Sequence, residues 1–360
     1  MGKSVKGRRG KMPKAVRIIS YIIAGIVIFV LIVLITFAVL TTIGKKSLYD
    51  NSQSEAPTLA GEADSASSSD IKWQEGWVRY NGKVYEYNDN ILTFLIMGID
   101  HNGKVTTAKN GIDGGQADSL FLLVLNPDDK KINIVAINRN LMTDVDVYDK
   151  EGNFVDTRRL QICLQHGYGD AKEISCERQE TVVSKLMYNL PIHGYAAINM
   201  GAISKINDSV DGVTLEVLED MTKADKSLIK GSTVTLKGKT AFTYVNWRDD
   251  DIFDSATMRL DRQKQYLSAF EKQLISKTKE NITFPVTLFN TITPYMVTDI
   301  DVSQVSYLAS QALGYSFDAD HIYTIDGTTK LADTGYEEFT YDEDSLKKLV
   351  IEVFYKEVSE

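Results

Sequence analysis

Side chains that can bind phosphate or a metal ion stand at the ends of neighbouring predicted strands. They are Asp100 after the strand-like run 91–98, Asp118 before the run 119–126, and Arg139 after the run 132–138. The turn between the second and third runs is short and rich in Pro and Asp, which predicts an antiparallel hairpin. If the first strand lies antiparallel beside the second, connectivity alone brings two carboxylates and an arginine to one edge of the sheet.

A second group of polar residues follows much later in the chain. Arg248 precedes a predicted helix at 257–277, and Arg259, Arg262 and Gln263 stand at positions i, i+3 and i+4 of that helix. Residues with this spacing share one helix face. Several arginines that converge are typical of a clamp for phosphate or carboxylate, because the guanidinium fork binds such oxygens bidentately.

Asp100 and Asp118 together predict a Mg²⁺ site that a substrate phosphate completes, since Mg²⁺ takes hard oxygen ligands. The alternative for all these residues is structural. Arginines on a helix among several aspartates usually form surface ion pairs, and Asp after a strand is often a turn residue. The four histidines show no metal-binding spacing, and neither HExxH nor GxSxG occurs, so a zinc or serine hydrolase is not supported.

In the rest of the chain, the spacing of apolar residues predicts strands that alternate with helices. Asn81-Gly82 is the preferred turn of a hairpin over 77–87. Further strands are expected at 212–218, 233–236 and 321–325, and further helices at 177–190, 303–313 and 344–358. The first two buried runs are almost continuously apolar, as expected of strands covered by helices on both faces. The pattern predicts an α/β fold, a three-layer α/β/α sandwich with a mixed central sheet.

An uncharged apolar segment at 18–43 predicts one N-terminal transmembrane helix that acts as a signal-anchor. At a rise of about 1.5 Å per residue it would reach roughly 39 Å, which is enough to cross a hydrocarbon core of about 30 Å. The tail 1–17 holds seven Lys and Arg and no acid, which favours a cytoplasmic N-terminus. We therefore expect a single-pass protein of the cell membrane whose C-terminal part is extracellular.

Composition divides the rest of the chain. Residues 44–72 are rich in Ser, Ala and acids, which predicts a flexible stalk, and 73–360 can bury the core of an outer domain. Seven of the 40 basic residues belong to the tail, which leaves 33 against all 49 acidic residues, a formal charge near −16. This balance argues against nucleic acid as a partner but allows a local basic pocket for a phosphorylated ligand.

Two cysteines, Cys163 and Cys176, both lie in the outer part with twelve residues between them. In an oxidising compartment they are candidates for a disulfide, and we expect them to pair. The alternative is two free, buried thiols.

The order of the motifs resembles the LytR-CpsA-Psr family of bacterial envelope proteins over nearly the whole chain. The matching segments are FLIMGID (94–100), ADSLFLLVLNPDDKKINIVAINRN (117–140), LPIHGYAAINMGAISKINDSVDGVTLEV (190–217), LKGKTAFTYVNWRDDD (236–251) and RLDRQ (259–263). A basic tail followed by an anchor is also similar to that family. Each segment alone is a weak signal, but the ordered set is specific.

The resemblance implies a phosphotransferase that moves a glycopolymer, such as teichoic acid or capsular polysaccharide, from undecaprenyl pyrophosphate to peptidoglycan. On that pattern Asp100 and Asp118 bind Mg²⁺ together with the diphosphate, and the catalytic residues are Asp118, Arg139, Arg248 and Arg259. The cationic and polar residues that would bind the diphosphate are Arg139, Arg159, Arg248, Arg259, Arg262 and Gln263. The family holds its lipid in an apolar tunnel between sheet and helices, for which 182–190 and 266–270 are candidate walls.

The chain departs from the family pattern at several site positions. Gln116 and Asn246 stand where the family usually has arginines, and Asn140 replaces a carboxylate after Arg139. These changes leave open a non-catalytic protein that binds or scaffolds lipid-linked polymer or cell wall, and a pyrophosphatase that uses water as its acceptor. The sequence does not identify the glycopolymer, the catalytic base or the oligomeric state.

Overall fold

A mixed sheet forms the centre of the computed structural model, which describes residues 36–49, 56–59, 74, 76–249, 251–253, 255–317 and 319–358. Its strands are, in spatial order, β11 (Met296–Thr298), β8 (Tyr195–Asn199), β3 (Leu92–Ile99), β4 (Ala117–Asn126), β5 (Lys131–Ile137) and β12 (Ile322–Thr324). The predicted pairing is confirmed: β3 is antiparallel to β4, and β4 is antiparallel to β5. Strands β8 and β12 then add in parallel, to β3 and β5 respectively.

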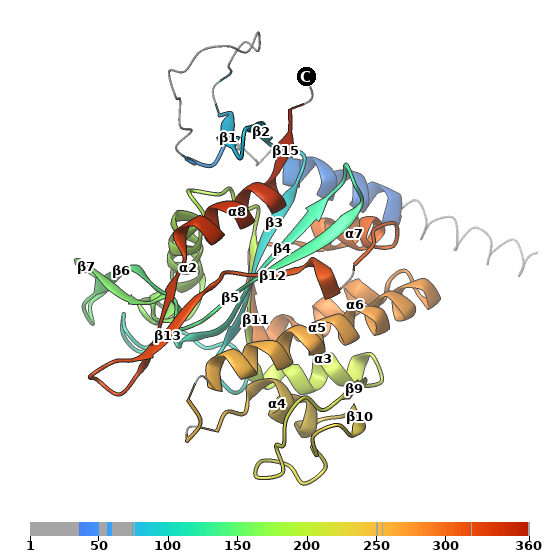
Figure 1. Cartoon of the computed structure of the whole chain (residues 1–360). Coiled ribbons are helices and arrows are strands. Elements are labelled where there is room, and N and C mark those ends of the chain that lie inside the picture. The colour runs from blue at the N-terminus through green and yellow to red at the C-terminus, as the bar shows by residue number, and fades with distance from the viewer. Residues whose placement is uncertain are drawn as a thin grey trace, which may run out of the picture.

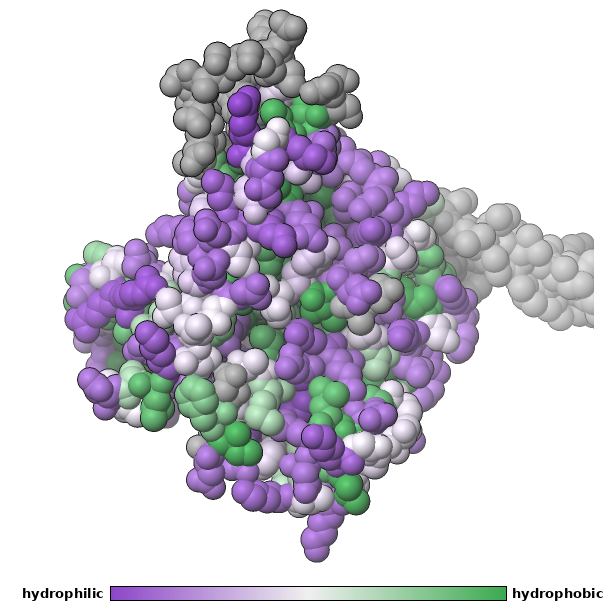
Figure 2. Space-filling view, in the orientation of Figure 1, coloured by the Kyte–Doolittle hydropathy of each residue, from purple (hydrophilic) through white to green (hydrophobic). Residues whose placement is uncertain are grey.

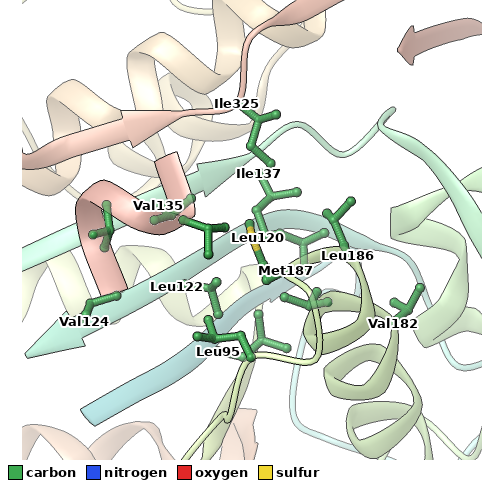
Figure 3. Close-up of a cluster of buried hydrophobic side chains, with 14 of the residues drawn as sticks. Leu95, Leu120, Leu122, Val124, Val135, Ile137, Val182, Leu186, Met187 and Ile325 are labelled. Carbon is green, nitrogen blue, oxygen red and sulfur yellow. The ribbon is translucent and has the colours of Figure 1, made fainter. Parts of the chain in front are cut away.

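Helices α2 (Glu173–Leu186) and α8 (Glu343–Phe354) cover one face of the sheet. Side chains that alternate along the strands point toward them, including Leu95 of β3 and Leu120 and Leu122 of β4, which are almost fully buried. Figure 3 shows these side chains meeting Val182, Leu186 and Met187 from α2 and the turn after it. This face holds the largest part of the core.

The opposite face of the sheet lies against another set of helices (Figure 1). They are α3 (Ile203–Ser209), α5 (Ser255–Glu280), α6 (Phe284–Ile292) and α7 (Val302–Ala312). Leu260 of α5, Ile292 of α6 and Tyr307 of α7 are buried against the alternate strand residues, such as Phe94. The three-layer α/β/α arrangement with a mixed sheet is therefore confirmed.

Smaller elements surround the sandwich. They are the hairpin β1 (Val78–Tyr80) and β2 (Lys83–Tyr87) with β15 (Tyr355–Glu357), the hairpin β6 (Met142–Tyr148) and β7 (Phe154–Gln161), the 3₁₀ helix η1 (Ile162–Gly167), the pair β9 (Val213–Glu216) and β10 (Thr233–Leu236), α4 (Lys239–Asn246), and the hairpin β13 (Gly327–Leu331) and β14 (Glu337–Tyr341). The strands β9 and β10 and helix α4 enclose a second small core against α5.

Two expectations about element boundaries are wrong. The last helix does not reach Val358 but ends at Phe354, because the chain continues as β15, whose Tyr355 pairs with Tyr87 of β2. Helix α2 begins at Glu173 and ends at Leu186, four residues earlier at each end than predicted.

Parts of the predicted stalk, residues 44–72, contact the folded domain. Residues 36–49 form a helix, and Leu48 is buried against Phe94 and Tyr307. Gly44 allows this close approach, since a Cβ there would lie 2.1 Å from the Ser303 carbonyl oxygen. Residues 56–59 also contact the domain. The expectation of a flexible stalk is therefore wrong for 44–49 and 56–59, because their apolar side chains find partners on the domain.

The predicted membrane helix at 18–43 lies largely outside the described residues. Only 36–43 of it fall within the helix described above. In the part of the chain with described structure, no helix combines the length and the apolar character needed to cross a membrane.

Candidate functional site

The Asp118 carboxylate, at the start of β4, lies between two arginines. Its Oδ1 forms an ion pair with Nη1 of Arg139, which follows β5, and its Oδ2 lies 3.4 Å from Nη1 of Arg259 in the first turns of α5. The antiparallel pairing of β4 and β5 brings Asp118 and Arg139 to one edge of the sheet, as the chain connectivity predicted. Helix α5, which packs across the sheet, supplies the third. The structure thus joins both groups of polar residues that the sequence singled out.

Arg259 is 5% exposed. Burial lowers the pKa of its guanidinium to about 10; Asp118 opposes that shift, and the charges of Arg139 and Arg248 add to it. The group therefore stays cationic at neutral pH, held close to other cations. Such a cluster attracts anions, since each added negative charge relieves repulsion in a poorly hydrated place.

Asp100 occupies the same edge, directly after β3. Its Oδ1 accepts a hydrogen bond of 2.8 Å from the backbone N–H of Gln116, which closes the long loop between the two aspartates. The Gln116 side chain in turn accepts a hydrogen bond of 2.5 Å from Nη2 of Arg139. At this position, where the family usually has an arginine, Gln116 provides a hydrogen-bond acceptor that orients Arg139.

A polar cavity of about 770 Å³ opens beside this cluster. It is lined by Gln116, Arg139, Asn140, Gln161, Leu164, Arg248, Asp251, Ile252, Phe253, Ser255, Leu331, Gly335, Tyr336 and Glu337. Two of the predicted arginines, Arg139 and Arg248, thus face one space. Its size is in the range of small-molecule sites, which hold roughly 300–1,000 Å³.

An apolar pocket of about 130 Å³ lies on the other side of the cluster, between the sheet and helices α3 and α5. Its walls include Ile96, Phe121, Ile198, Tyr266 and Leu267. Gln263 and Ser119 also line the pocket, and Gln263 Nε2 donates to Ser119 Oγ (2.7 Å) and to the Val245 carbonyl (3.0 Å). Gln263 therefore lies in the wall of this pocket.

Of the two candidate tunnel walls, the structure supports one in part. Tyr266 lines the apolar pocket, whereas the segment 182–190 packs into the main core on the opposite face of the sheet. The expectation for 182–190 is wrong, because its apolar spacing serves ordinary core packing.

Arg262 does not face either cavity, so its predicted role in binding diphosphate is wrong. Its side chain is 1% exposed, and Nε forms an ion pair of 2.7 Å with Glu219. Its Nη1 and Nη2 donate to the carbonyls of Tyr244 and Trp247. Arg262 therefore holds the end of α4 and the start of the segment that carries Arg248.

Arg159 also lies away from the polar cavity. It is exposed on β7, opposite Asp144 of β6, while Gln161, two residues further along the strand, lines the cavity. The predicted contact of Arg159 with diphosphate therefore has no support in the geometry.

The expected disulfide is wrong, since both cysteines are free and buried. Cys163 accepts a hydrogen bond of 3.3 Å from Arg139 Nη2, and burial raises the pKa of its thiol. Cys176 lies in α2 beside the ring of His166. Each cysteine thus has its own polar neighbour, Arg139 for Cys163 and His166 for Cys176. The short separation of the two cysteines in sequence did not predict their pairing correctly.

A metal ion bound by Asp100 and Asp118 would need further oxygen ligands from a substrate or from water. Within the described ranges, which omit residues 250 and 254, no group of three or more His, Cys, Asp or Glu side chains could hold a metal ion. Two carboxylates at one sheet edge beside arginines nevertheless fit Mg²⁺, which commonly uses one or two carboxylates with substrate phosphates and water.

Several residues of the polar cavity were missed by sequence reasoning, above all Glu337. Its Oε2 accepts a hydrogen bond of 3.2 Å from Asn140 Nδ2, and its backbone carbonyl accepts one of 2.6 Å from Gln161 Nε2. The alternating run before and after the Gly335 turn could have predicted the hairpin β13–β14. No local signal could have placed that hairpin against Asn140.

Fold and site together define a class of protein: an α/β/α sandwich with an arginine–carboxylate cluster between an apolar pocket and a polar cavity. A family model described as the LytR_cpsA_psr family matches residues 47–353. The chain therefore belongs to the LytR-CpsA-Psr family, as the ordered motifs predicted.

Similar proteins include Biofilm regulatory protein A of Streptococcus mutans, 23% identical over 243 residues, which cover 66% of this chain and 56% of the relative. Another is the polyisoprenyl-teichoic acid–peptidoglycan teichoic acid transferase TagU of Oceanobacillus iheyensis, 24% identical over 234 residues. That match covers 64% of this chain and 66% of TagU. Both matches span less than two thirds of the relative's own length.

Among solved structures, TagV of B. subtilis is similar in fold. It superposes with a TM-score of 0.55 at 21% identity, covering 73% of this chain and 96% of TagV. The architecture of the sandwich is thus that of known family members.

Replacing Arg262 tests its reassignment from ligand binding to folding. Arg262→Ala removes a buried side chain that donates to two carbonyls and leaves the partly buried Glu219 without its partner, so it should lower the free energy of unfolding by about 3–5 kcal/mol. Lys264→Ala, which removes only a partly exposed pair with Asp261, should change it by less than about 1 kcal/mol. Denaturant unfolding measures both values. Unchanged stability in Arg262→Ala would contradict the reassignment.

Proposed function

We propose that this protein is a phosphotransferase that moves a glycopolymer from undecaprenyl pyrophosphate to peptidoglycan. The observation that carries the proposal is the position of the Asp118–Arg139–Arg259 cluster between an apolar pocket and a polar cavity. A polyprenyl diphosphate has the same three parts in the same order: an apolar chain, a diphosphate and a polar glycan. The name of the relative TagU, a teichoic acid transferase to peptidoglycan, supports this reading. The candidate polymers are teichoic acid, capsular polysaccharide and other wall polysaccharides.

The cationic side chains would act mainly by charge. Arg139 and Arg248 line the polar cavity and would bind the diphosphate oxygens, while buried Arg259 would strengthen the positive field behind Asp118. Negative charge that develops on the phosphoryl oxygens in the transition state would then be stabilised by guanidinium groups that are already in position. Gln116 keeps the Arg139 guanidinium aimed into the cavity through its hydrogen bond.

The apolar pocket would hold the part of the lipid next to the diphosphate. Its side chains come from the sheet and from α5, and Ser119 adjoins Asp118 in β4, so the pocket ends at the charged cluster. A prenyl chain gains roughly 25 cal/mol for each Å² of apolar surface removed from water. Binding there would place the diphosphate at the arginines.

Membrane anchoring belongs to the same proposal, since the donor is a membrane lipid. The predicted helix 18–43 and the basic tail before it would hold the protein in the cell membrane, with residues 73–360 on the outer side. Peptidoglycan, the proposed acceptor, lies on that side.

Replacing Arg248 separates binding of phosphate from folding. Arg248 is only half-buried, so Arg248→Ala should keep the melting temperature of the full chain while transfer falls about a hundredfold, or roughly 3 kcal/mol. Arg248→Lys should recover only part of the rate, because Lys cannot bind two oxygens in a fork.

The matched control is Arg158→Ala, which removes an exposed arginine of β7 paired with Asp156. The assay follows transfer from a synthetic polyprenyl-diphosphate-linked glycan to peptidoglycan fragments. Wild-type rates in Arg248→Ala would count against the proposed site, and a lipid released with water alone as acceptor would indicate a pyrophosphatase.

Chelation tests the metal part of the proposal. Mg²⁺ at Asp100 and Asp118 would neutralise phosphate charge, so EDTA should abolish transfer by the wild type and added Mg²⁺ should restore it. Asp100→Asn should raise the Mg²⁺ concentration required for half-maximal rate. Full activity in EDTA would contradict a metal at this site.

A further inference from the structure

Helix 36–49, which overlaps the end of the predicted membrane span, is fixed directly to the domain. Gly44 packs so closely on α7 that a Cβ there would lie 2.1 Å from the Ser303 carbonyl oxygen. One turn further along the helix, Leu48 is buried against Tyr307 of α7. These contacts set the direction in which the helix leaves the domain.

The side chains of helix 36–49 indicate where it meets the membrane. Its first half has no charged residue, and Val39 and Ile43 are 51% and 53% exposed. The first cations after the predicted span are Lys45 and Lys46, which are both exposed. Lysines directly after an apolar helix lie at the level of the lipid head groups, because the ammonium group stays in water while its stem covers apolar surface. The contact with α7 immediately precedes these lysines, so α7 meets the helix at that level.

Helix α6 brings an uncharged segment to the same side of the domain. Residues 281–298 contain no Asp, Glu, Lys, Arg or His, although charged residues make up 25% of the chain. Helix α6 packs against α7, and Figure 1 shows helix 36–49, α7 and α6 together on the right side of the domain. Figure 2, in the same orientation, shows hydrophobic side chains among polar ones on that side. The exposed side chains of α6, termed the α6 surface below, are Thr287, Asn290 and Thr291.

The inner face of α6 adjoins the apolar pocket. Its Leu288 and Phe289 pack with three isoleucines of the sheet and α3, and the same three isoleucines line the pocket. They are Ile96, Ile198 and Ile206. Helix α6 therefore lies between the apolar pocket and the α6 surface.

We propose that helix 36–49, docked through Gly44 and Leu48, holds the α6 surface against the outer face of the membrane, among the lipid head groups. The inference rests on the membrane anchoring in the proposed function and adds the side of the domain that meets the lipid. Charge favours this side. The outer part of the chain is strongly acidic, so a bilayer with anionic lipids repels faces that carry acids, whereas 281–298 carries none.

Quenchers carried by the lipid test which side of the domain meets the bilayer. The full chain is reconstituted in vesicles of phosphatidylcholine and phosphatidylglycerol with a nitroxide on the head group. A bimane is attached to Thr287→Cys on α6 or, as the matched control, to Thr328→Cys on β13, which lies on the opposite side of the domain in Figure 1. Both threonines are exposed, whereas the native Cys163 and Cys176 are buried.

The label at position 287 should be quenched at least about threefold more strongly than the label at 328, because a helix at the membrane interface lies within about 10 Å of the head groups. Gly44→Leu should force helix 36–49 away from the Ser303 carbonyl and lower the quenching at 287 to the level at 328. Thr42→Leu adds a side chain of the same size at an exposed position of the same helix, and it should leave the quenching unchanged. Both variants should still float with the vesicles.

Equal quenching at positions 287 and 328 would overturn this inference and indicate another occupant of the α6 surface, such as a second copy of the chain. Quenching at 287 that persists in Gly44→Leu would also overturn it. The transfer assay separates the two proposals. Transfer without preferential quenching at 287 would overturn this inference alone, whereas preferential quenching without transfer would overturn the proposed function alone. A full chain that does not float with the vesicles would overturn the anchoring and, with it, this inference.

Discussion

The ion cluster of Asp118 with Arg139 and Arg259 is the interaction on which the site depends. A carboxylate and two guanidinium groups removed from water are stable only while they face one another, because an unpaired buried charge costs several kcal/mol. The cluster ties β4, the end of β5 and α5 together, and α5 is the helix that closes the apolar pocket. Its geometry therefore fixes where a charged ligand and an apolar chain can meet.

The cluster of Asp118, Arg139 and Arg259 lies next to two different spaces, the polar cavity and the apolar pocket. Ser119 of β4 lines the apolar pocket, while the neighbouring Asp118, where a register shift interrupts the β3–β4 pairing, contacts the arginines, so one strand serves both. Arg262, which resembles a ligand-binding residue by its spacing, instead fixes the chain between α4 and Arg248. Arg262 thus supports the shape of the site from within the protein.

Much of this arrangement could be predicted from local patterns. The short turn after β4 and the apolar runs around it predicted the strand order, and with it the meeting of Asp100, Asp118 and Arg139. Helical spacing correctly put Arg259 and Gln263 near one another, but it could not show that Arg262 points into the protein. The side of a helix that faces a ligand depends on tertiary packing, which spacing does not encode.

The contacts between distant segments could not be predicted. Cys163 and Cys176 are close in sequence, yet Arg139 and His166 give each its own partner. The loss of a carboxylate at Asn140 looked like a weakened site, whereas the structure places the Glu337 carboxylate against that amide from nearly two hundred residues away. A hydrogen bond over such a separation leaves no trace in the local pattern.

The central claim is that a prenyl chain enters the apolar pocket and its diphosphate reaches the arginine cluster. Photocrosslinking of the full chain with a benzophenone-bearing prenyl diphosphate, followed by peptide mass spectrometry, measures this most directly. The label should fall on β4 and α5, around Phe121, Tyr266 and Leu267, and Arg248→Ala should weaken it. Labelling that falls on α2, or that is unaffected by unlabelled prenyl diphosphate, would contradict the claim.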